Sequence, residues 1–308
     1  MEYCPGNGRR ANTRFAPTGT GMGSGLQFLA AHERLSEHTS FRIGGPAEFF
    51  FRPIGRPELI RVMSRCRHAG LPVRVLGAGT NLLVRDAGVC GAVIATGGVR
   101  YVSAGPATVA ADCGVRLARL IAVAGTCGLS GLEPLAGIPG SVGGAIVMNA
   151  GTAAGCIADA VAEITVLTPE GELAVLRPEE AGFGYRSSQV GGALVLSARL
   201  KLAPSDPERV RKAVRETWLA KRASQPMKEA SAGCVFKNPP GGSAGKIIDG
   251  LGLKGAMAGG AVVSQKHANF IVNAGPATAA DVLALIERIR TAVFNALKIR
   301  LELEIDVW

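Results

Sequence analysis

The apolar residues in the first hundred positions recur at two spacings, one typical of strands and one typical of an amphipathic helix. From 58 to 69 they fall at helical intervals, with Pro57 in a favourable first-turn position and Gly70 as a stop signal. Short apolar runs bounded by glycine, proline or polar residues predict four strands around this helix. These strands are expected at 47–51, 73–76, 82–84 and 92–95. The pattern indicates a compact β-α-β-β unit.

The middle of the chain mixes strand and helix signals in the same way. A helix is expected at 115–126, closed by Gly128, and the sequence at 139–141 is typical of a second helix start. Apolar runs on either side of the turn at 169–171 predict a β-hairpin. The strands expected in this region are 108–111, 163–167, 173–176 and 194–202.

Two long amphipathic helices dominate the pattern after residue 204. Asp206 and Pro207 are a strong start signal for a helix to about 223, which we take as the boundary of a second lobe. Thr278 and Asp281 resemble a capping box at the start of the other helix. The final segment alternates, which predicts a strand with one apolar and one acidic face. The inward residues are Leu301, Leu303, Ile305 and Val307, and the outward ones are Glu302, Glu304 and Asp306.

Composition narrows the class of protein. Hydrophobic residues make up 47% of the 308 positions, which allows a large core, whereas residues 1–27 lack periodicity and are interpreted as a disordered leader, with Met22 as an alternative start. The net charge of +10 is either a general solubility charge or an attraction for anionic ligands. Zinc-finger spacing and aromatic-rich basic strands are absent, so nucleic acid is not favoured as a partner.

Cysteine usage and apolar run lengths indicate the compartment. The seven cysteines are scattered and form no C-x-x-C pair, which argues against a disulfide framework or a zinc site and favours a reducing cytoplasm. No apolar run reaches membrane-spanning length, and no signal-peptide core stands near the N-terminus. Neither membrane insertion nor secretion is therefore expected.

Two glycine-rich loops are the most informative feature. Five of the fifteen residues from Gly137 to Gly151 are glycine, and this run contains no acid or base. A second loop runs from Gly77 to Val84. Such backbone can approach a ligand closely, and an uncharged loop must hold a phosphate mainly through its backbone N–H groups. The two loops together predict a large cofactor that carries a diphosphate.

Other segments carry candidate chemistry. Arg186, in a polar loop, is either a surface residue or a group that holds a carboxylate with two hydrogen bonds. Cys234 is either a buried small apolar residue or, at an expected loop edge, a thiol of pKa near about 8.5 that can donate a proton. Glu304 is an exposed strand carboxylate by pattern alone. A basic series is either a solvated face or a diphosphate-binding surface, and it comprises Lys246, Lys254, Lys266, His267 and Asn269.

In their order and spacing these segments resemble the UDP-N-acetylenolpyruvoylglucosamine reductase (UDP-N-acetylmuramate dehydrogenase) family, over roughly residues 28 to 307. An ordered set of motifs is far more specific than any one of its members. The set comprises Thr39–Ala47, Gly77–Val84, Gly137–Gly151, Tyr185-Arg186 with Ser188, Gly233–Pro239, Gly259–Ala261 with His267–Phe270, and Leu301–Ile305.

The resemblance implies an α+β fold. An FAD-binding lobe of the vanillyl-alcohol-oxidase type is expected in two subdomains, 28–98 and 99–204, followed by a substrate-binding domain at 205–308. It also implies non-covalent FAD, NADPH as co-substrate, and reduction of the enolpyruvyl group of UDP-N-acetylglucosamine enolpyruvate to UDP-N-acetylmuramate in peptidoglycan synthesis. Family members are often monomeric and act in the cytoplasm, so a monomer is expected here.

The resemblance also assigns roles by motif position. Arg186 is expected to stabilise enolate-like charge, Glu304 to orient or polarise the substrate carboxylate, and Cys234 to protonate C2. No metal is expected. The implied cofactor residues are Arg42, Gly77, Ala78, Gly79, Thr80, Asn81, Leu82, Gly137, Ile138, Gly140, Ser141, Gly143, Gly144 and Asn149. The implied substrate residues are Tyr185, Ser188, Lys237, Asn238, Lys246, Lys254 and His267.

The chain departs from the most familiar family pattern in two places. The proton donor is commonly serine, and Cys234 adds an expected sensitivity to thiol reagents. Only 189–193 separate Arg186 from the next expected strand, so the chain resembles the second subtype, which lacks the tyrosine-bearing segment of the first. Two alternatives stay open: another FAD oxidoreductase of the same fold acting on an alcohol or sugar, and a flavin- or uridine-nucleotide-binding protein without turnover.

Overall fold

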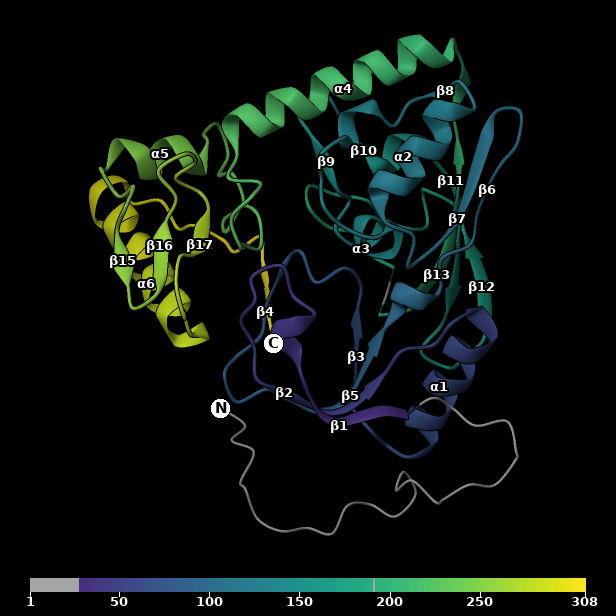
Figure 1. The fold of residues 1–308 in the computed structure, drawn as a ribbon, viewed down its shortest axis with the longest axis horizontal. Helices are drawn as coiled ribbons and strands as arrows, with labels where there is room; N and C mark the ends of the chain where they lie inside the picture. Colours follow the sequence, from purple (N-terminus) through teal and green to yellow (C-terminus); the bar gives the residue numbers. More distant parts are fainter. Residues whose placement is uncertain (1–27, 191) are drawn as a thin grey trace.

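A mixed four-stranded sheet covered by one helix forms the first part of the computed structural model, which describes residues 28–190 and 192–308 (Figure 1). Its strands lie in the order β1 (Phe28–Arg34), β2 (Pro46–Phe51), β5 (Val89–Ala95) and β3 (Val73–Leu76). Both β2 and β3 run parallel to β5, and α1 (Arg56–His68) connects them. The helix and strands expected here are confirmed, whereas β1 was not expected. The predicted leader, residues 1–27, lies outside the described residues.

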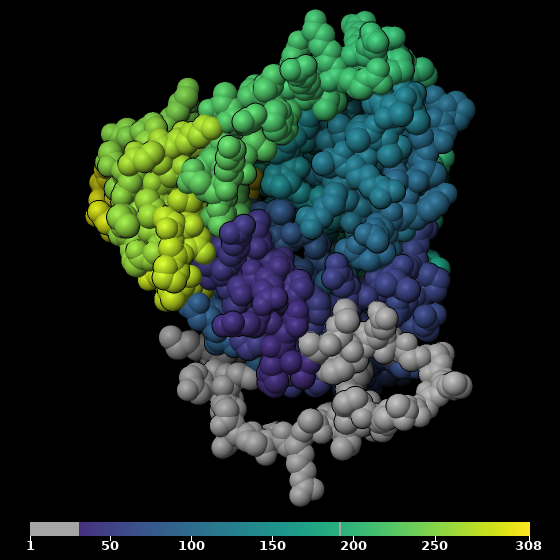
Figure 2. Space-filling model, viewed as in Figure 1, coloured from purple at the N-terminus to yellow at the C-terminus, as the bar shows by residue number. Residues whose placement is uncertain are grey.

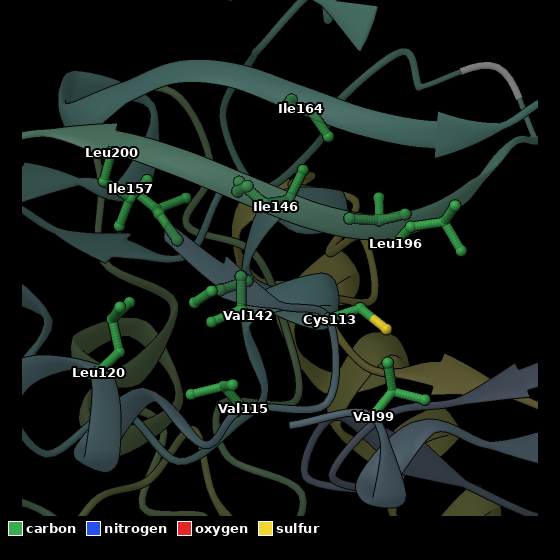
Figure 3. Close-up of a cluster of buried hydrophobic side chains, with 14 of the residues drawn as sticks. Val99, Cys113, Val115, Leu120, Val142, Ile146, Ile157, Ile164, Leu196 and Leu200 are labelled. Carbon is green, nitrogen blue, oxygen red and sulfur yellow. The ribbon is translucent and has the colours of Figure 1, made fainter. Parts of the chain in front are cut away.

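An antiparallel five-stranded sheet forms the second part. Its order is β12 (Leu173–Leu176), β11 (Val161–Leu167), β13 (Leu194–Lys201), β7 (Thr108–Asp112) and β6 (Val102–Ala104). Helices α2 (Leu117–Thr126) and α3 (Val142–Val147) pack against this sheet. Figure 3 shows how apolar side chains from the helices and strands, such as Leu120, Ile146 and Leu200, fill one core between them. The predicted hairpin and the helix start near Ser141 are confirmed.

A smaller lobe follows, with its own core. The antiparallel strands β15 (Met257–Ala258), β16 (Ala261–Val263) and β17 (Ile271–Asn273) pack with α5 (Ala244–Gly250) and α6 (Ala279–Leu297). The predicted capping box is present, because Thr278 and Asp281 exchange side-chain-to-backbone hydrogen bonds. Helix α6 buries an apolar face that comprises Val282, Leu285, Ile286, Ile289 and Val293.

Helix α4 (Pro207–Ser224) spans the top of the molecule from the part with the second sheet to the small lobe (Figures 1 and 2). As predicted, its N-cap is Asp206. The Asp206 carboxylate accepts hydrogen bonds from the N–H groups of Glu208 and Arg209. Although the sequence suggests a boundary here, α4 packs on α2 and on the short helix Glu133–Leu135. The helix therefore belongs by contact to the second sheet's side, and the domain limits given above stay predictions.

The end of the chain returns to the first lobe. Strand β18 (Asp306–Val307) pairs in parallel with β4 (Leu82–Leu83), directly after the first glycine loop. The predicted alternation holds at Leu301 and Ile305, which are buried. The continuous strand expected from 301 to 307 is wrong, because the preceding residues bridge to Phe236 in the small lobe and only the last two residues pair with β4.

Smaller elements complete the chain. They are the strands β8 (Leu129–Ser130), β9 (Gly151–Thr152), β10 (Gly155–Cys156) and β14 (Ala203–Pro204), and the 3-10 turns Leu35–Glu37, Thr96–Gly98 and Ile157–Ala160. Five cysteines in the described residues are free thiols, but Cys90 is disulfide-bonded, so the expectation of no disulfides is wrong at this position. None of the described helices has the length and hydropathy of a membrane-spanning segment.

Candidate active site

The two glycine loops, about sixty residues apart in sequence, lie against each other. The Thr80 hydroxyl donates a hydrogen bond to the carbonyl oxygen of Pro139 at 3.0 Å. A Cβ atom on Gly77 would lie 2.7 Å from Oγ of Ser141, so only glycine allows this approach. The structure thus brings together the two segments that the sequence singled out.

The first loop presents unpaired backbone donors. Among the described residues, the N–H groups of Ala78, Gly79, Thr80 and Asn81 have no hydrogen-bond acceptor. Gly79 adopts φ +65°, and a Cβ there would overlap the carbonyl oxygen of His38. Successive free N–H groups around a left-handed residue form an anion-binding concavity, and the set fits a diphosphate.

The second loop is partly committed to the fold. Ser141 is the N-cap of α3, and the N–H of Gly143 donates to the Cys113 carbonyl at 2.8 Å. A Cβ on Gly143 would lie 3.0 Å from that of Cys113, so this glycine lets α3 pack closely on β7. Leu82 and Ile138, both expected at the cofactor, contribute their side chains to hydrophobic cores. Gly140 and Ser141 lie next to Thr80 and Gly77 of the first loop.

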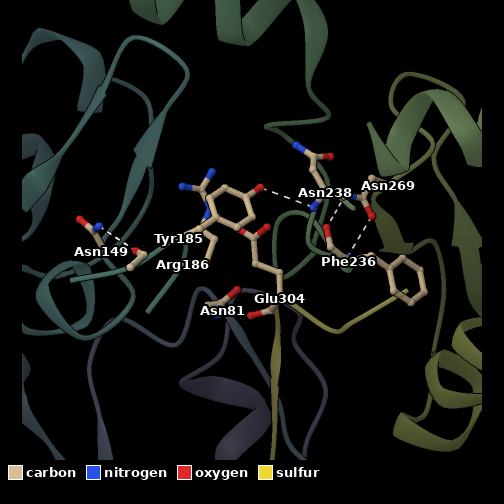
Figure 4. Close-up of polar contacts among 9 residues, drawn as sticks. Asn81, Asn149, Tyr185, Arg186, Phe236, Asn238, Asn269 and Glu304 are labelled. Atoms are coloured by element: carbon tan, nitrogen blue, oxygen red, sulfur yellow. Dashed lines mark hydrogen bonds and ion pairs between the residues drawn. The ribbon is translucent and has the colours of Figure 1, made fainter. Parts of the chain in front are cut away.

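Arg186 stands at the tip of a tight turn closed between Gly184 and Ser187 (Figure 4). Its φ of +53° is uncommon for a side chain larger than glycine, and such strain persists only where neighbours fix it. Asn149 supplies that restraint by donating to the Gly184 carbonyl at 2.9 Å, and Ser188 donates to the Val147 carbonyl at 3.0 Å. The structure therefore gives Asn149 and Ser188 the task of holding the arginine turn on α3.

The arginine side chain reaches Glu304 from the far end of the chain. Its Nε donates to Oε1 of Glu304 at 2.8 Å, and the two side chains are only 22% and 17% exposed. The prediction of an exposed carboxylate is therefore wrong for Glu304, whereas Glu302 on the same face is exposed. Burial raises the pKa of Glu304, and the charge of Arg186 opposes that rise.

Cys234 lies beside this pair, bridged to Phe270 in the small lobe. Burial raises the pKa of its thiol to about 12, the charge of Glu304 adds to the rise, and Arg186 and Asn269 oppose it. The expectation of an ordinary thiol pKa is wrong, since Cys234 is half-buried beside the charge of Glu304. Such a thiol is protonated at neutral pH, and the expected reactivity toward alkylating reagents falls with its thiolate fraction.

Tyr185, next to Arg186, spans the gap to the small lobe. Its hydroxyl oxygen accepts a hydrogen bond from the N–H of Asn238 at 3.4 Å, and its ring lies under the Arg186 guanidinium (Figure 4). The Asn238 side chain accepts a hydrogen bond at 3.0 Å from the N–H of Ala244, the first residue of α5. One sequence-predicted substrate residue thus contacts another across the cleft.

The basic residues expected at the substrate are more dispersed. Lys237 lies 3.6 Å from Glu302, near Glu304, and Lys254 pairs with Asp249 at 2.7 Å. His267 packs edge-on against Phe270, and burial lowers its pKa. Lys246 on α5 is exposed on the surface, and so is Arg42, which was expected at the cofactor and follows the Ser40 contact with Gly79.

One residue of the site escaped sequence analysis as a functional group. Lys221 of α4 has a buried Nζ without a hydrogen-bond partner among the described residues, and burial together with Arg186 lowers its pKa to about 8. Its side chain lies beside Gly137. A buried amine without a partner calls for an anion.

Asn269, which the sequence placed in the basic series, bonds the backbone of Phe236 instead.

Comparison with known proteins agrees with this arrangement. Residues 47–177 match a family model described as an FAD binding domain, and residues 225–308 match the UDP-N-acetylenolpyruvoylglucosamine reductase C-terminal domain. The reductase of that name from Moorella thermoacetica is 47% identical over 92% of this chain and 94% of its own. The chain belongs to the UDP-N-acetylenolpyruvoylglucosamine reductase family.

Further relatives support the same assignment. A second reductase of this family, from Symbiobacterium thermophilum, is 44% identical over 90% of the chain and 91% of its own length. The crystal structure of the family member from Thermus caldophilus superposes with a TM-score of 0.78 at 44% identity, and covers 89% of this chain and 97% of that one. The α+β fold with an FAD-binding lobe is thereby confirmed for this reductase family member.

We predict that Gly79→Ala weakens FAD binding more than tenfold, about 1.4 kcal/mol or more, because the new Cβ overlaps the His38 carbonyl and distorts the free N–H groups. Gly70→Ala is the matched control, since its φ of +64° is the same but nothing lies within 4 Å of a Cβ. It should cost about 1 kcal/mol of folding stability and leave FAD affinity unchanged. Flavin fluorescence titration of the two apoproteins measures the FAD affinity of each variant. Equal FAD affinities in the two variants would contradict the prediction.

We predict that Glu304→Gln gains stability relative to the parent protein as pH rises. Because burial raises the folded-state pKa, ionisation of Glu304 disfavours the folded protein between the ordinary carboxyl pKa and the raised one. The difference in melting temperature should be small near pH 4, grow through that window and then level off. Glu302→Gln is the control, since that side chain is 76% exposed. A difference independent of pH would refute the assignment.

Proposed function

We propose that this protein is an NADPH-dependent flavoenzyme that reduces the enolpyruvyl group of UDP-N-acetylglucosamine enolpyruvate to give UDP-N-acetylmuramate for peptidoglycan synthesis. The observation that carries the proposal is the meeting of Arg186, Cys234 and Glu304, from three separate segments, beside two loops suited to a diphosphate. The reductases named in the comparisons take their name from the reduction of UDP-N-acetylenolpyruvoylglucosamine. The site of this chain contains the groups that such a reduction requires.

The cofactor fits the residues present. The free N–H groups of Ala78–Asn81 and the facing Gly140–Ser141 are the groups proposed to hold the FAD diphosphate. When bound, FAD supplies the hydride that it has received from NADPH. Asn81 also joins this loop to the acid, because its side-chain amide donates to the backbone carbonyl of Glu304 at 2.9 Å.

The remaining chemistry falls to the side chains of the trio. Hydride addition at C3 leaves negative charge at C2 and on the adjoining carboxylate, which Arg186 is placed to stabilise in a site shielded from water. Glu304, held by Arg186 at 2.8 Å, orients or polarises the substrate carboxylate. Cys234 keeps its proton at neutral pH and delivers it to C2.

Anionic parts of the substrate have further partners. The partnerless amine of Lys221 suits the substrate carboxylate or diphosphate, and Tyr185, Asn238 and Lys237 line the same cleft. Lys246, Lys254 and His267 are proposed to lie farther along the nucleotide. We also propose that the enzyme acts in the cytoplasm as a monomer without a nucleic-acid partner.

The half-reactions test the function directly. With NADPH under anaerobic conditions, the purified yellow protein should bleach, and UDP-N-acetylglucosamine enolpyruvate should then restore the oxidised flavin spectrum. Cys234→Ala should bleach at the parent rate but be reoxidised about 10²- to 10⁴-fold more slowly, the usual contribution of a positioned acid. Cys234→Ser should stay within about tenfold of the parent, since a hydroxyl can take over the acid's role in the same place.

The control and the contradicting outcomes are equally specific. Cys66→Ala removes a buried thiol from α1, outside the site, and should leave both half-reactions unchanged. Bleaching without reoxidation in the parent protein would reject the proposed acceptor. Normal reoxidation in Cys234→Ala would reject Cys234 as the proton donor.

A further inference from the structure

The side chain of Asn269 is buried behind the proton donor. It is 3% exposed, and both ends of its amide bond the same backbone residue. Oδ1 accepts from the N–H of Phe236 at 3.0 Å, and Nδ2 donates to the carbonyl of Phe236 at 2.8 Å (Figure 4). Only a side chain with an acceptor and a donor in one plane can make this pair of contacts.

The contacts matter because the donor segment lies between two others. On one side, Lys237 donates to the Glu302 carbonyl and Glu304 donates to the Val235 carbonyl, so this side is paired with the end of the chain. On the other side, backbone pairing with the small lobe stops after the bond from Val235 N–H to the Asn269 carbonyl. The Asn269 amide continues the pairing for one more residue and satisfies both buried groups of Phe236.

The electrostatic surroundings of the thiol agree with this placement. Burial and Glu304 raise the pKa of Cys234, whereas Arg186 and Asn269 lower it. The groups that face the sulfur are therefore one acid, Glu304, and two that favour its anion, Arg186 and Asn269. A thiolate left by proton transfer would otherwise stand buried beside a carboxyl group.

We propose that Asn269 is a positioning residue for the proton donor. It fixes the segment that carries Cys234 between the small lobe and the Glu304 segment. With hydride supplied by bound FAD at C3, the C2–C3 π pair would take the proton of the Cys234 thiol at C2, and the S–H bonding pair would stay on sulfur. Water later returns the proton. The inference rests on the proposed function.

Asn269→Asp and Asn269→Ser test the proposal. The aspartate keeps the acceptor for Phe236 N–H but replaces the donor with an oxygen, and the serine removes the amide without adding charge. We expect bleaching by NADPH within about twofold of the parent and reoxidation by substrate slower by about tenfold or more, because a small misplacement of the proton donor costs rate steeply. The solvent deuterium isotope effect on reoxidation should rise, because proton transfer then limits the step.

Two controls separate positioning from a purely structural role. Asn273→Asp changes an asparagine four residues on that donates to the Phe41 carbonyl at 3.1 Å and accepts from the Ala277 N–H, away from the donor segment. It should behave like the parent. In a Cys234→Ala background, Asn269→Asp should slow reoxidation no further, since its effect passes through the thiol.

The outcomes are distinguishable. Parent-like reoxidation in an FAD-loaded Asn269 variant would overturn the inference, and so would an equal slowing in the Cys234→Ala background. Failure of both variants to fold or to retain FAD would assign Asn269 a structural role and also overturn it. If the parent protein itself is not reoxidised by the substrate, the proposed function fails instead.

Discussion

The parallel pairing of β18 with β4 is the constraint on which the site depends. Asp306 donates to the Asn81 carbonyl, Trp308 donates to Leu83, and Arg85 donates to Trp308, so the end of the chain is fixed to the segment after the first glycine loop. Asn81 adds its side-chain bond to Glu304. This return brings the carboxyl of Glu304 to the loop with the free N–H groups, and it closes the small lobe over Cys234. A few backbone hydrogen bonds thus join the proposed cofactor site to the acid and the proton donor.

Burial gives this junction its chemical character. In water an arginine–glutamate pair and a thiol would titrate ordinarily, but here the lobes exclude solvent and favour the uncharged forms of both acids. Charge that develops on a substrate in such a place meets Arg186 and the partnerless amine of Lys221, with little screening by solvent. The pKa of about 12 keeps the proton on Cys234 at neutral pH, and the pKa of Glu304 shifts in the same direction.

Local signals in the sequence predicted much of the fold. Asp206 with Pro207, and Thr278 with Asp281, begin helices as expected because capping depends on neighbours within one turn. The glycine loops were found for a similar reason, since left-handed residues such as Gly79 need glycine. The same local reasoning placed most strands of the two large sheets.

Properties set by distant contacts were beyond such reasoning. The alternating pattern predicted the face on which Glu304 lies, but it could not predict that the side chain is covered there. The pKa of Cys234 likewise depends on groups from three segments. Asn269 acts on a residue 33 positions away, and Lys221 shows its lack of a partner only when α4 is placed beside Gly137. The roles of Arg186 and Glu304 came from family resemblance, and their pairing became visible only in three dimensions.

The most direct measurement is a crystal structure of FAD-loaded Cys234→Ala with UDP-N-acetylglucosamine enolpyruvate bound. The account predicts the FAD diphosphate on the N–H groups of Ala78–Asn81, the substrate carboxylate on Arg186, and C2 of the enolpyruvyl group facing residue 234. An enolpyruvyl group directed away from residue 234, or a diphosphate bound elsewhere, would contradict it.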